Sequence, residues 1–290
     1  NMRVKCDALQ IPTEDFFTEQ VVDNIDELYS GFVKHLVDDQ LIDRFYSGED
    51  IFLDPDEIKL NPHQFLMLVS NQNEKKTALS KFINYNLPIK PLIEYRDGIW
   101  SLKARNKEQM FAFNLLMNPD IPIVTMTGQA GCGKTLLAIA SGLQQIMEDK
   151  TKKYKKLVVS RPVQPVGKDI GFLPGTLEEK MNPWLMPIQD NLEFLIGDNK
   201  ETIELLYENG TIEVEALTYI RGRSISNAFI IIDEAQNLSV HELKTIITRV
   251  GEGTKIILTG DIEQIDNVYL DSVSNGLSYA IEKFKDHEIA

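Results

Sequence analysis

Residues 121–137, with the sequence IPIVTMTGQAGCGKTLL, constrain the fold of this chain more than any other segment. The first part is apolar and β-branched, which is typical of a buried strand, and the last part begins a helical pattern. The residues between them, 128–135, match GxxxxGK[ST]. A strand, a glycine-rich turn and a helix in this order predict a phosphate-binding loop, or P-loop.

The residue types in this loop suit a nucleoside triphosphate. Backbone N–H groups at the start of a helix bind anions, and glycines leave that backbone accessible. Lys134 is expected to reach the β- and γ-phosphates, and the Thr135 hydroxyl to bind Mg²⁺. The alternative is a glycine-rich turn that holds no ligand. The expected nucleotide-binding residues of the loop are Gly128, Gln129, Ala130, Gly131, Cys132, Gly133, Lys134 and Thr135.

A second buried strand is predicted where the sequence FIIIDEAQ covers residues 229–236. Four apolar residues suit a strand covered on both faces, and two carboxylates follow at its end. This pattern is typical of a Walker B motif, in which Asp233 would hold Mg²⁺ and Glu234 would polarise the attacking water. The alternative is a core strand that ends in a solvated acidic turn.

A third strand, in residues 255–266 with the sequence KIILTGDIEQID, also ends in polar residues. The carboxyl ends of parallel strands meet at the edge of an open α/β sheet where ligands bind. Gln264 is therefore a candidate sensor of the γ-phosphate. The alternative is an ordinary polar exit from a strand.

The predicted fold class is α/β: a P-loop NTPase with a mainly parallel sheet and helices on both faces, preceded by a small α+β module. We expect the module in residues 1–99 and the P-loop domain in residues 100–290, because Pro88, Pro91 and the turn Asp97-Gly98 interrupt regular structure between them. The acidic residues 38–57 are predicted to form turns. Residues 176–197 are predicted to be helical, with a break or kink at Pro183 and Pro187.

Composition restricts the setting and the partners. No apolar run is long enough to cross a membrane, and no leader is visible. Cys6 and Cys132, the two cysteines, provide no disulfide framework, so we expect a protein of the reducing cytoplasm. The net charge of −14 disfavours a broad nucleic-acid surface. Residues 150–156, KTKKYKK, form the one dense basic run, for which a solvated loop is favoured over a binding patch.

Together, the segments GQAGCGKTLLA, SRPVQPVGKDIGFLPGTLEEKM, YIRGRS, IIIDEAQN and LTGDIEQID resemble the PhoH-like ATPases, which are relatives of superfamily one helicases. The resemblance extends from about Trp100 to the last residue. It implies ATP as substrate, Mg²⁺ as cofactor and RNA as a partner. It also implies that Asn106 and Gln109, beside Arg105, recognise adenine; the alternative for Gln109 is a surface-helix glutamine.

The resemblance assigns further roles and shows departures. It implies catalytic roles for Glu234, Lys134 and Gln264, and phosphate or RNA contacts for Arg161, Arg221 and Arg223. Cys132 stands where many members have threonine. Residues before Trp100 resemble the connector of members with an N-terminal PIN ribonuclease domain, and no such domain is visible. Members continue beyond the position of Ala290 with a strand and a Lys/Arg-Ser segment, so we expect a truncated C-terminus.

Three functions are compatible with these residues. The first is an ATPase that couples hydrolysis to RNA binding, remodelling or unwinding. The second is a nucleotide-gated binding or assembly module with little turnover, which regulates a partner or an attached ribonuclease. A small-molecule kinase is the third, and the GDxxQ segment argues against it. The sequence leaves the oligomeric state open; in a homo-oligomer, an arginine from a neighbouring copy could complete each site.

Overall fold

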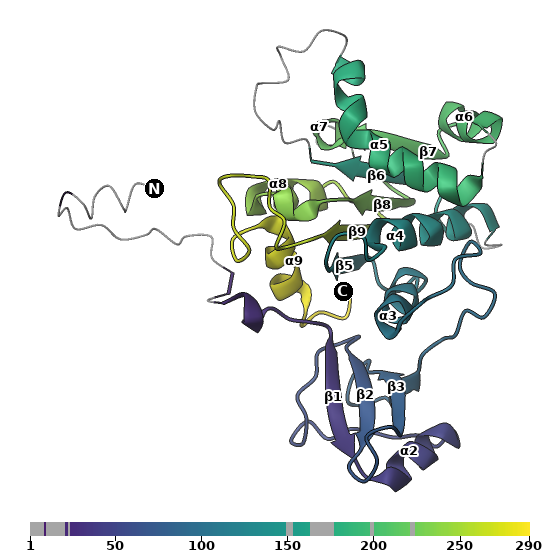
Figure 1. The fold of residues 1–290 in the computed structure, drawn as a ribbon, viewed down its shortest axis with the longest axis vertical. Helices are drawn as coiled ribbons and strands as arrows, with labels where there is room; N and C mark the ends of the chain where they lie inside the picture. Colours follow the sequence, from purple (N-terminus) through teal and green to yellow (C-terminus); the bar gives the residue numbers. More distant parts are fainter. Residues whose placement is uncertain are drawn as a thin grey trace.

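The computed structural model describes residues 9, 21–22, 24–148, 153–162, 177–197, 200–220 and 224–290. Within these residues the chain forms two β-sheets, one of four strands and one of five (Figure 1). The five-stranded sheet carries the three motifs that the sequence singles out. The four-stranded sheet forms the module that precedes it.

All strands of the larger sheet run parallel, in the order β5-β9-β8-β6-β7. The P-loop follows β5, the pair Asp233-Glu234 follows β8, and β9 lies between these two strands. The predicted α/β class with a mainly parallel sheet is confirmed. The strand bounds are β5 (Ile123–Thr127), β6 (Lys156–Arg161), β7 (Ile212–Ala216), β8 (Ala228–Ile232) and β9 (Lys255–Gly260).

Helices cover both faces of this sheet (Figure 1). One face packs against α3 (Lys107–Leu116), α4 (Lys134–Leu143), α5 (Leu177–Ile196) and α6 (Lys200–Glu208). The other face packs against α7 (Leu217–Ile220), α8 (Val240–Ile247) and α9 (Gly276–Phe284).

The P-loop helix α4 lies very close to the sheet at Gly142. A Cβ atom at this position would lie 2.8 Å from Leu157 Cδ1 on β6 and 3.0 Å from Phe229 Cδ1 on β8. Glycine therefore permits the close approach, at the usual cost in helix propensity. The contact holds α4, and with it the P-loop, against the strands that carry the other motifs.

The predicted break in the helix at Pro183 and Pro187 is wrong. Helix α5 runs without interruption through both prolines. A proline removes one backbone hydrogen bond and crowds the preceding turn, which costs about 3 kcal/mol. Packing of Leu185, Ile188 and Leu192 in the core below the helix offsets this cost.

The N-terminal module contains a sheet in the order β1-β2-β3-β4, with β1 parallel to β2 and the other pairs antiparallel. The prediction of turns throughout residues 38–57 is wrong, because a helix, α2, begins there. Ile42 and Phe45 lie one turn apart on α2 and are buried, so packing stabilises this acidic helix. The bounds are β1 (Phe32–Val37), α2 (Asp39–Tyr46), β2 (Phe65–Ser70), β3 (Thr77–Lys81) and β4 (Lys90–Pro91).

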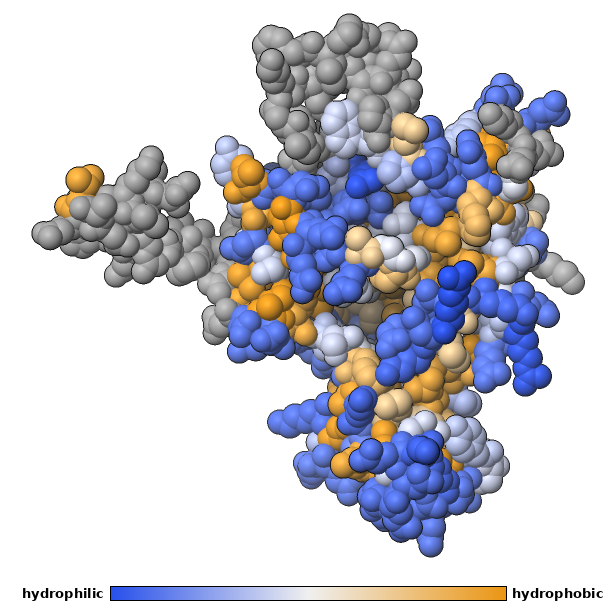
Figure 2. Space-filling model, in the orientation of Figure 1, coloured by the Kyte–Doolittle hydropathy of each residue, from blue (hydrophilic) through white to orange (hydrophobic). Residues whose placement is uncertain are grey.

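Aromatic side chains join the module to the larger domain. The ring of Phe65 on β2 stacks on Phe111 of α3 with centroids 4.4 Å apart, and Phe32 on β1 lies 5.4 Å from the same ring. Beside them is a mostly apolar cavity of about 380 Å³ that also borders β5 along its whole length. Apolar surface at this junction is visible between the two parts in Figure 2.

Two lysines are buried near the same junction. Lys255 on β9 donates hydrogen bonds of 2.7 Å to the carbonyls of Leu115 and Asn118, at the end of α3. Burial lowers the pKa of Lys255 well below its usual value, and the charges of Lys81 and Lys153 lower it further. Burial also lowers the pKa of Lys81 from 10.5 to about 8. The fold therefore carries an electrostatic cost at neutral pH.

Replacing Lys81 by methionine is expected to stabilise the fold at pH 7 by about 1 to 3 kcal/mol, since each unit of pKa shift corresponds to about 1.4 kcal/mol. Its folded pKa is depressed, so the penalty is fully present below about pH 8 and disappears as the pH approaches 10.5. Urea unfolding from pH 7 to 10.5 measures this difference. Lys75→Met, at an exposed position of the same module, is the control. A gain from Lys81→Met that does not change with pH would contradict the electrostatic explanation.

Candidate nucleotide site

The P-loop adopts backbone angles that require its glycines. Gly131 and Gly133 have φ values of 79° and 93°, in the left-handed region that side chains with a Cβ rarely adopt. Gly133 immediately precedes α4, whose first residue is Lys134. At the start of the loop, the Gly128 N–H donates to the Gly260 carbonyl at 3.3 Å, which extends the pairing of β5 with β9. The loop is therefore anchored to the sheet at one end and to a helix at the other.

Lys134 folds back over the loop that precedes it. Its Nζ atom lies 2.6 Å from the Gly128 carbonyl oxygen and 3.0 Å from that of Gln129. The ammonium group thus lies above the glycine-rich turn, at the N-terminal end of α4. Both the charge of the lysine and the helix dipole favour an anion at this place.

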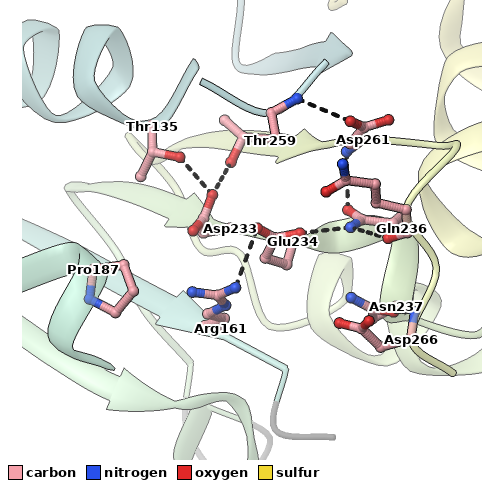
Figure 3. A network of polar contacts seen from close by, with 12 residues as sticks. Thr135, Arg161, Pro187, Asp233, Glu234, Gln236, Asn237, Thr259, Asp261 and Asp266 are labelled. Atoms are coloured by element: carbon pink, nitrogen blue, oxygen red, sulfur yellow. Dashed lines mark hydrogen bonds and ion pairs between the residues drawn. The ribbon is translucent and has the colours of Figure 1, made fainter. Parts of the chain in front are cut away.

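Asp233 lies at the centre of the site (Figure 3). The hydroxyls of Thr135 on α4 and Thr259 on β9 both donate to Asp233 Oδ1 at 2.7 Å. The Asp233 N–H donates to the Ser160 carbonyl on β6, and the side chain is buried. Two elements from distant parts of the sequence, α4 and β9, therefore hold the carboxylate, and β6 holds the backbone of the same residue.

Glu234, the next residue, is held in an unusual conformation. Its backbone has φ 55° and ψ 38°, a left-handed geometry that is uncommon for residues other than glycine. Glu234 Oε1 lies 3.2 Å from Arg161 Nη2, and Oε2 accepts a hydrogen bond of 2.5 Å from Gln236 Nε2 (Figure 3). Backbone strain of this kind persists where the surroundings enforce it, and it often occurs in functional sites.

The segment after β9 contacts the P-loop directly. Asp261 is buried, and its Oδ2 accepts a hydrogen bond of 2.9 Å from the Ala130 N–H. Gln264 lies three residues further on; its backbone carbonyl accepts from Gln236 Nε2 at 2.8 Å, and its side chain is exposed. The predicted γ-phosphate sensor therefore lies at the same edge of the sheet as Glu234.

The predicted adenine-recognition segment borders the loop from the other side. Asn106 caps α3 by accepting from the Gln109 N–H at 2.9 Å. The Gln109 carboxamide accepts from the Arg105 N–H at 2.8 Å and donates to the Cys132 carbonyl at 3.1 Å. Gln109 thus contacts the P-loop backbone, which is not expected of an unattached surface glutamine.

The structure brings most of the predicted site residues together at one edge of the sheet. The P-loop, Asp233, Glu234, Gln264, Gln109 and Arg161 all lie there, although their roles stay predictions. Arg221 and Arg223 lie outside the residues that the structure describes. Sequence reasoning missed Thr259 and Gln236, and it gave Asp261 no role of its own. The available signal was that Gln236 ends the segment DEAQ, that Asp261 belongs to the GD pair and that Thr259 directly precedes this pair.

In the described parts of the chain, no group of three or more His, Cys, Asp or Glu residues is arranged to hold a metal ion. Nor does any helix in those parts have the length and apolarity that crossing a membrane requires.

Comparison with known proteins identifies the family. A family model described as "PhoH-like protein" matches residues 101–290. The chain belongs to the PhoH-like family. This assignment agrees with the motifs and with the parallel sheet, and it gives the chain the character of a nucleotide-binding P-loop NTPase.

The similarity to individual PhoH-like proteins extends over the N-terminal module as well. Protein PhoH2 of Bacillus subtilis is 50% identical over 292 residues, covering 100% of this chain and 65% of the relative. Protein PhoH2 of Mycolicibacterium smegmatis is 32% identical, covering 99% of this chain and 63% of the relative. The chain thus spans somewhat less than two thirds of the length of these relatives.

Thr259→Val should show how much the second hydroxyl contributes to holding Asp233. Valine keeps the branched shape but leaves the buried carboxylate without one donor, so the free energy of unfolding should fall by about 1 to 3 kcal/mol. Thr259→Ser, which retains the hydroxyl, should cost less. Urea unfolding of the three proteins measures the difference. A serine variant that is less stable than the valine variant would contradict this assignment.

Proposed function

We propose that this PhoH-like chain binds ATP together with Mg²⁺ and hydrolyses the terminal phosphate. The observation that carries the proposal is the 2.7 Å contact between the Thr135 hydroxyl and Asp233 Oδ1. A P-loop threonine and the carboxylate after a buried strand are the pair that P-loop NTPases use around the metal. Their contact across 98 residues of sequence is not expected of a ligand-free glycine turn.

The side chains around Thr135 fit Mg²⁺. This ion prefers oxygen ligands and is usually bound by one or two protein groups together with waters and substrate phosphates. Thr135 supplies a hydroxyl and Asp233 a buried carboxylate, and they lie 2.7 Å apart at the start of the P-loop helix. When bound, the ion would neutralise negative charge on the phosphates. Thr135 and Asp233 are the residues that would hold it.

The proposed roles of Lys134, Glu234 and Gln264 follow from their positions in the site. Lys134 binds the β- and γ-phosphate oxygens and stabilises charge that develops during transfer. Glu234 orients the attacking water and accepts its proton, while the contact with Arg161 fixes one of its oxygens. Gln264 contacts the γ-phosphate from the end of β9. Catalysis then rests on positioning and electrostatics, as is usual for phosphoryl transfer.

Gln109 and Asn106 bind the adenine base. Gln109 already contacts the loop through the Cys132 carbonyl, so its carboxamide lies next to the phosphate site. A carboxamide can donate and accept at once, which suits the amino group and ring nitrogen of adenine. ATP is therefore the proposed substrate among the nucleoside triphosphates.

We further propose that hydrolysis is coupled to RNA, and the support comes from the family resemblance, because the Arg161 guanidinium pairs with Glu234 in this structure. In the described part of the basic run, residues 153–156, Lys156 pairs with Glu213 at 2.7 Å and Lys153 donates to the Pro119 carbonyl, so these two lysines offer little support. The net charge of −14 disfavours a broad RNA-binding surface, and it therefore favours the alternative of a nucleotide-gated module with little turnover. In either case a homo-oligomer could supply an arginine to each site.

Two substitutions separate binding from turnover. Lys134→Ala removes the charge that faces the phosphates, so nucleotide affinity should fall at least about tenfold. Glu234→Gln keeps the shape but removes the base, so ATP binding should persist while phosphate release falls by about a hundredfold or more. Fluorescent-nucleotide titration and phosphate release measure the two effects. Normal release by the Glu234→Gln protein would exclude the proposed role.

Adding single-stranded RNA distinguishes the two proposed functions. An RNA-coupled ATPase should release phosphate several-fold faster with RNA, and the increase should shrink at high salt because phosphate-backbone contacts are screened. Binding of ATP with no release, with or without RNA, would support the gated module. Phosphate release in steady state at two salt concentrations is the measurement, with Glu234→Gln as the control.

A further inference from the structure

We propose that Gln236 is a positioning residue, which holds Glu234 in place and connects it to the P-loop through Asp261. The inference deepens the proposed function and rests on it. Gln236 is fully buried and lies two residues after Glu234, at the end of the β8 motif. It faces the segment that follows β9 (Figure 3).

The Gln236 carboxamide makes three hydrogen bonds, and each goes to a functional segment. Nε2 donates to Glu234 Oε2 at 2.5 Å and to the Gln264 carbonyl at 2.8 Å. Oε1 accepts from the Asp261 N–H at 3.2 Å. A reversed amide would place its donor against an N–H group and its oxygen against two acceptors, so the orientation follows from the partners. The side chain thus fixes one carboxylate oxygen of the proposed base.

Gly260 leaves the space that the Gln236 carboxamide occupies. A Cβ atom at Gly260, the last residue of β9, would lie 2.3 Å from Gln236 Oε1. Only glycine allows the carboxamide to approach the end of β9 this closely. The glycine of the GD pair therefore has a specific partner, and the contact joins the ends of β8 and β9.

Asp261 extends the connection to the P-loop. Its N–H contacts Gln236, and its carboxylate accepts from the Ala130 N–H at 2.9 Å. A continuous series of hydrogen bonds therefore runs from the P-loop through Asp261 and Gln236 to Glu234. A displacement of the P-loop backbone is transmitted to the proposed base through these contacts. Glu234, whose strained backbone depends on its surroundings, is the residue this series constrains.

A role in positioning differs from a role in packing alone. If Gln236 only filled space, methionine of similar volume would preserve the reaction. If Gln236 positions Glu234, methionine misplaces the base while every residue proposed to bind ATP is kept. Misplacement by about 1 Å costs about a hundredfold in rate. Turnover should therefore fall while the KM for ATP remains nearly constant.

The experiment compares phosphate release and nucleotide affinity in five full-length proteins: wild type, Gln236→Met, Gln236→Glu, Glu234→Gln and the double variant Glu234→Gln/Gln236→Met. We expect Gln236→Met to lower kcat about a hundredfold with KM changed by less than about threefold. Gln236→Glu keeps the shape but sets a carboxylate against Glu234, so it should lose at least as much. In the Glu234→Gln background, Gln236→Met should lower phosphate release no further.

Gln145→Met is the matched control, because Gln145 is also a buried amide but donates to the Leu116 and Ser141 carbonyls away from the site. Its kcat should remain within about twofold of wild type. A Gln236→Met protein with wild-type kcat would overturn the proposal. So would an equal loss in the Gln145→Met control, which would indicate a general effect of removing a buried amide.

A second measurement separates this proposal from the proposed function. Urea midpoints of wild type, Glu234→Gln, Gln236→Met and the double variant form a cycle that requires no turnover. Non-additive shifts support the contact between the two side chains, and additive shifts overturn it. If the wild-type protein releases no more phosphate than Glu234→Gln, the proposed hydrolysis is overturned. The urea midpoints would still show whether the side chains of Glu234 and Gln236 interact.

Discussion

The site depends on one buried carboxylate that is held by hydroxyl groups from two sides. Asp233 accepts from Thr135 on the P-loop helix and from Thr259 on β9, both at 2.7 Å. Burying a carboxylate is costly unless its hydrogen bonds are satisfied, so both donors are needed to keep it in place. Because β9 lies between β5 and β8, it brings the second hydroxyl to Asp233. The close packing of α4 at Gly142 keeps the P-loop helix against β6 and β8.

Around Asp233, the same edge of the sheet carries a more strained arrangement. Glu234 has a left-handed backbone, and its two oxygens contact different partners, Arg161 and Gln236. Arg161 comes from β6, and Gln236 is tied to the segment after β9. The proposed base is therefore sensitive to both flanking strands, and through Asp261 to the P-loop. Such an arrangement suits a reaction in which nucleotide binding and catalysis must be coordinated.

Local sequence patterns predicted the parts of the structure that local physics determines. The P-loop follows from its glycine motif, and the strands β8 and β9 from continuous apolar runs that end in polar residues, so their type and place could be predicted. Helix α2 could not, because its acidic sequence is stabilised by two buried side chains, Ile42 and Phe45. The uninterrupted α5 likewise depends on core packing that outweighs two prolines.

The residues of the site likewise divide into those that a local motif predicts and those that only the fold brings to the site. Lys134, Asp233 and Glu234 follow from motifs whose chemistry is legible in the sequence. Thr259 and Gln236 do not, because a threonine inside a strand and a glutamine after a motif are ordinary until strand order places them. The order β5-β9-β8 is a long-range property, and it determines which side chains meet at the edge. Family membership supports the overall assignment, while individual roles depend on this geometry.

A crystal structure with Mg²⁺ and a non-hydrolysable ATP analogue tests the central claim most directly. The account predicts the β-phosphate against the backbone N–H groups of the loop, with Lys134 Nζ within hydrogen-bond distance of the β- and γ-phosphates. It also predicts that Mg²⁺ would be held by the Thr135 hydroxyl and the Asp233 carboxylate. An analogue bound elsewhere in the protein, with the Thr135–Asp233 contact unaltered and no ion beside it, would contradict the account.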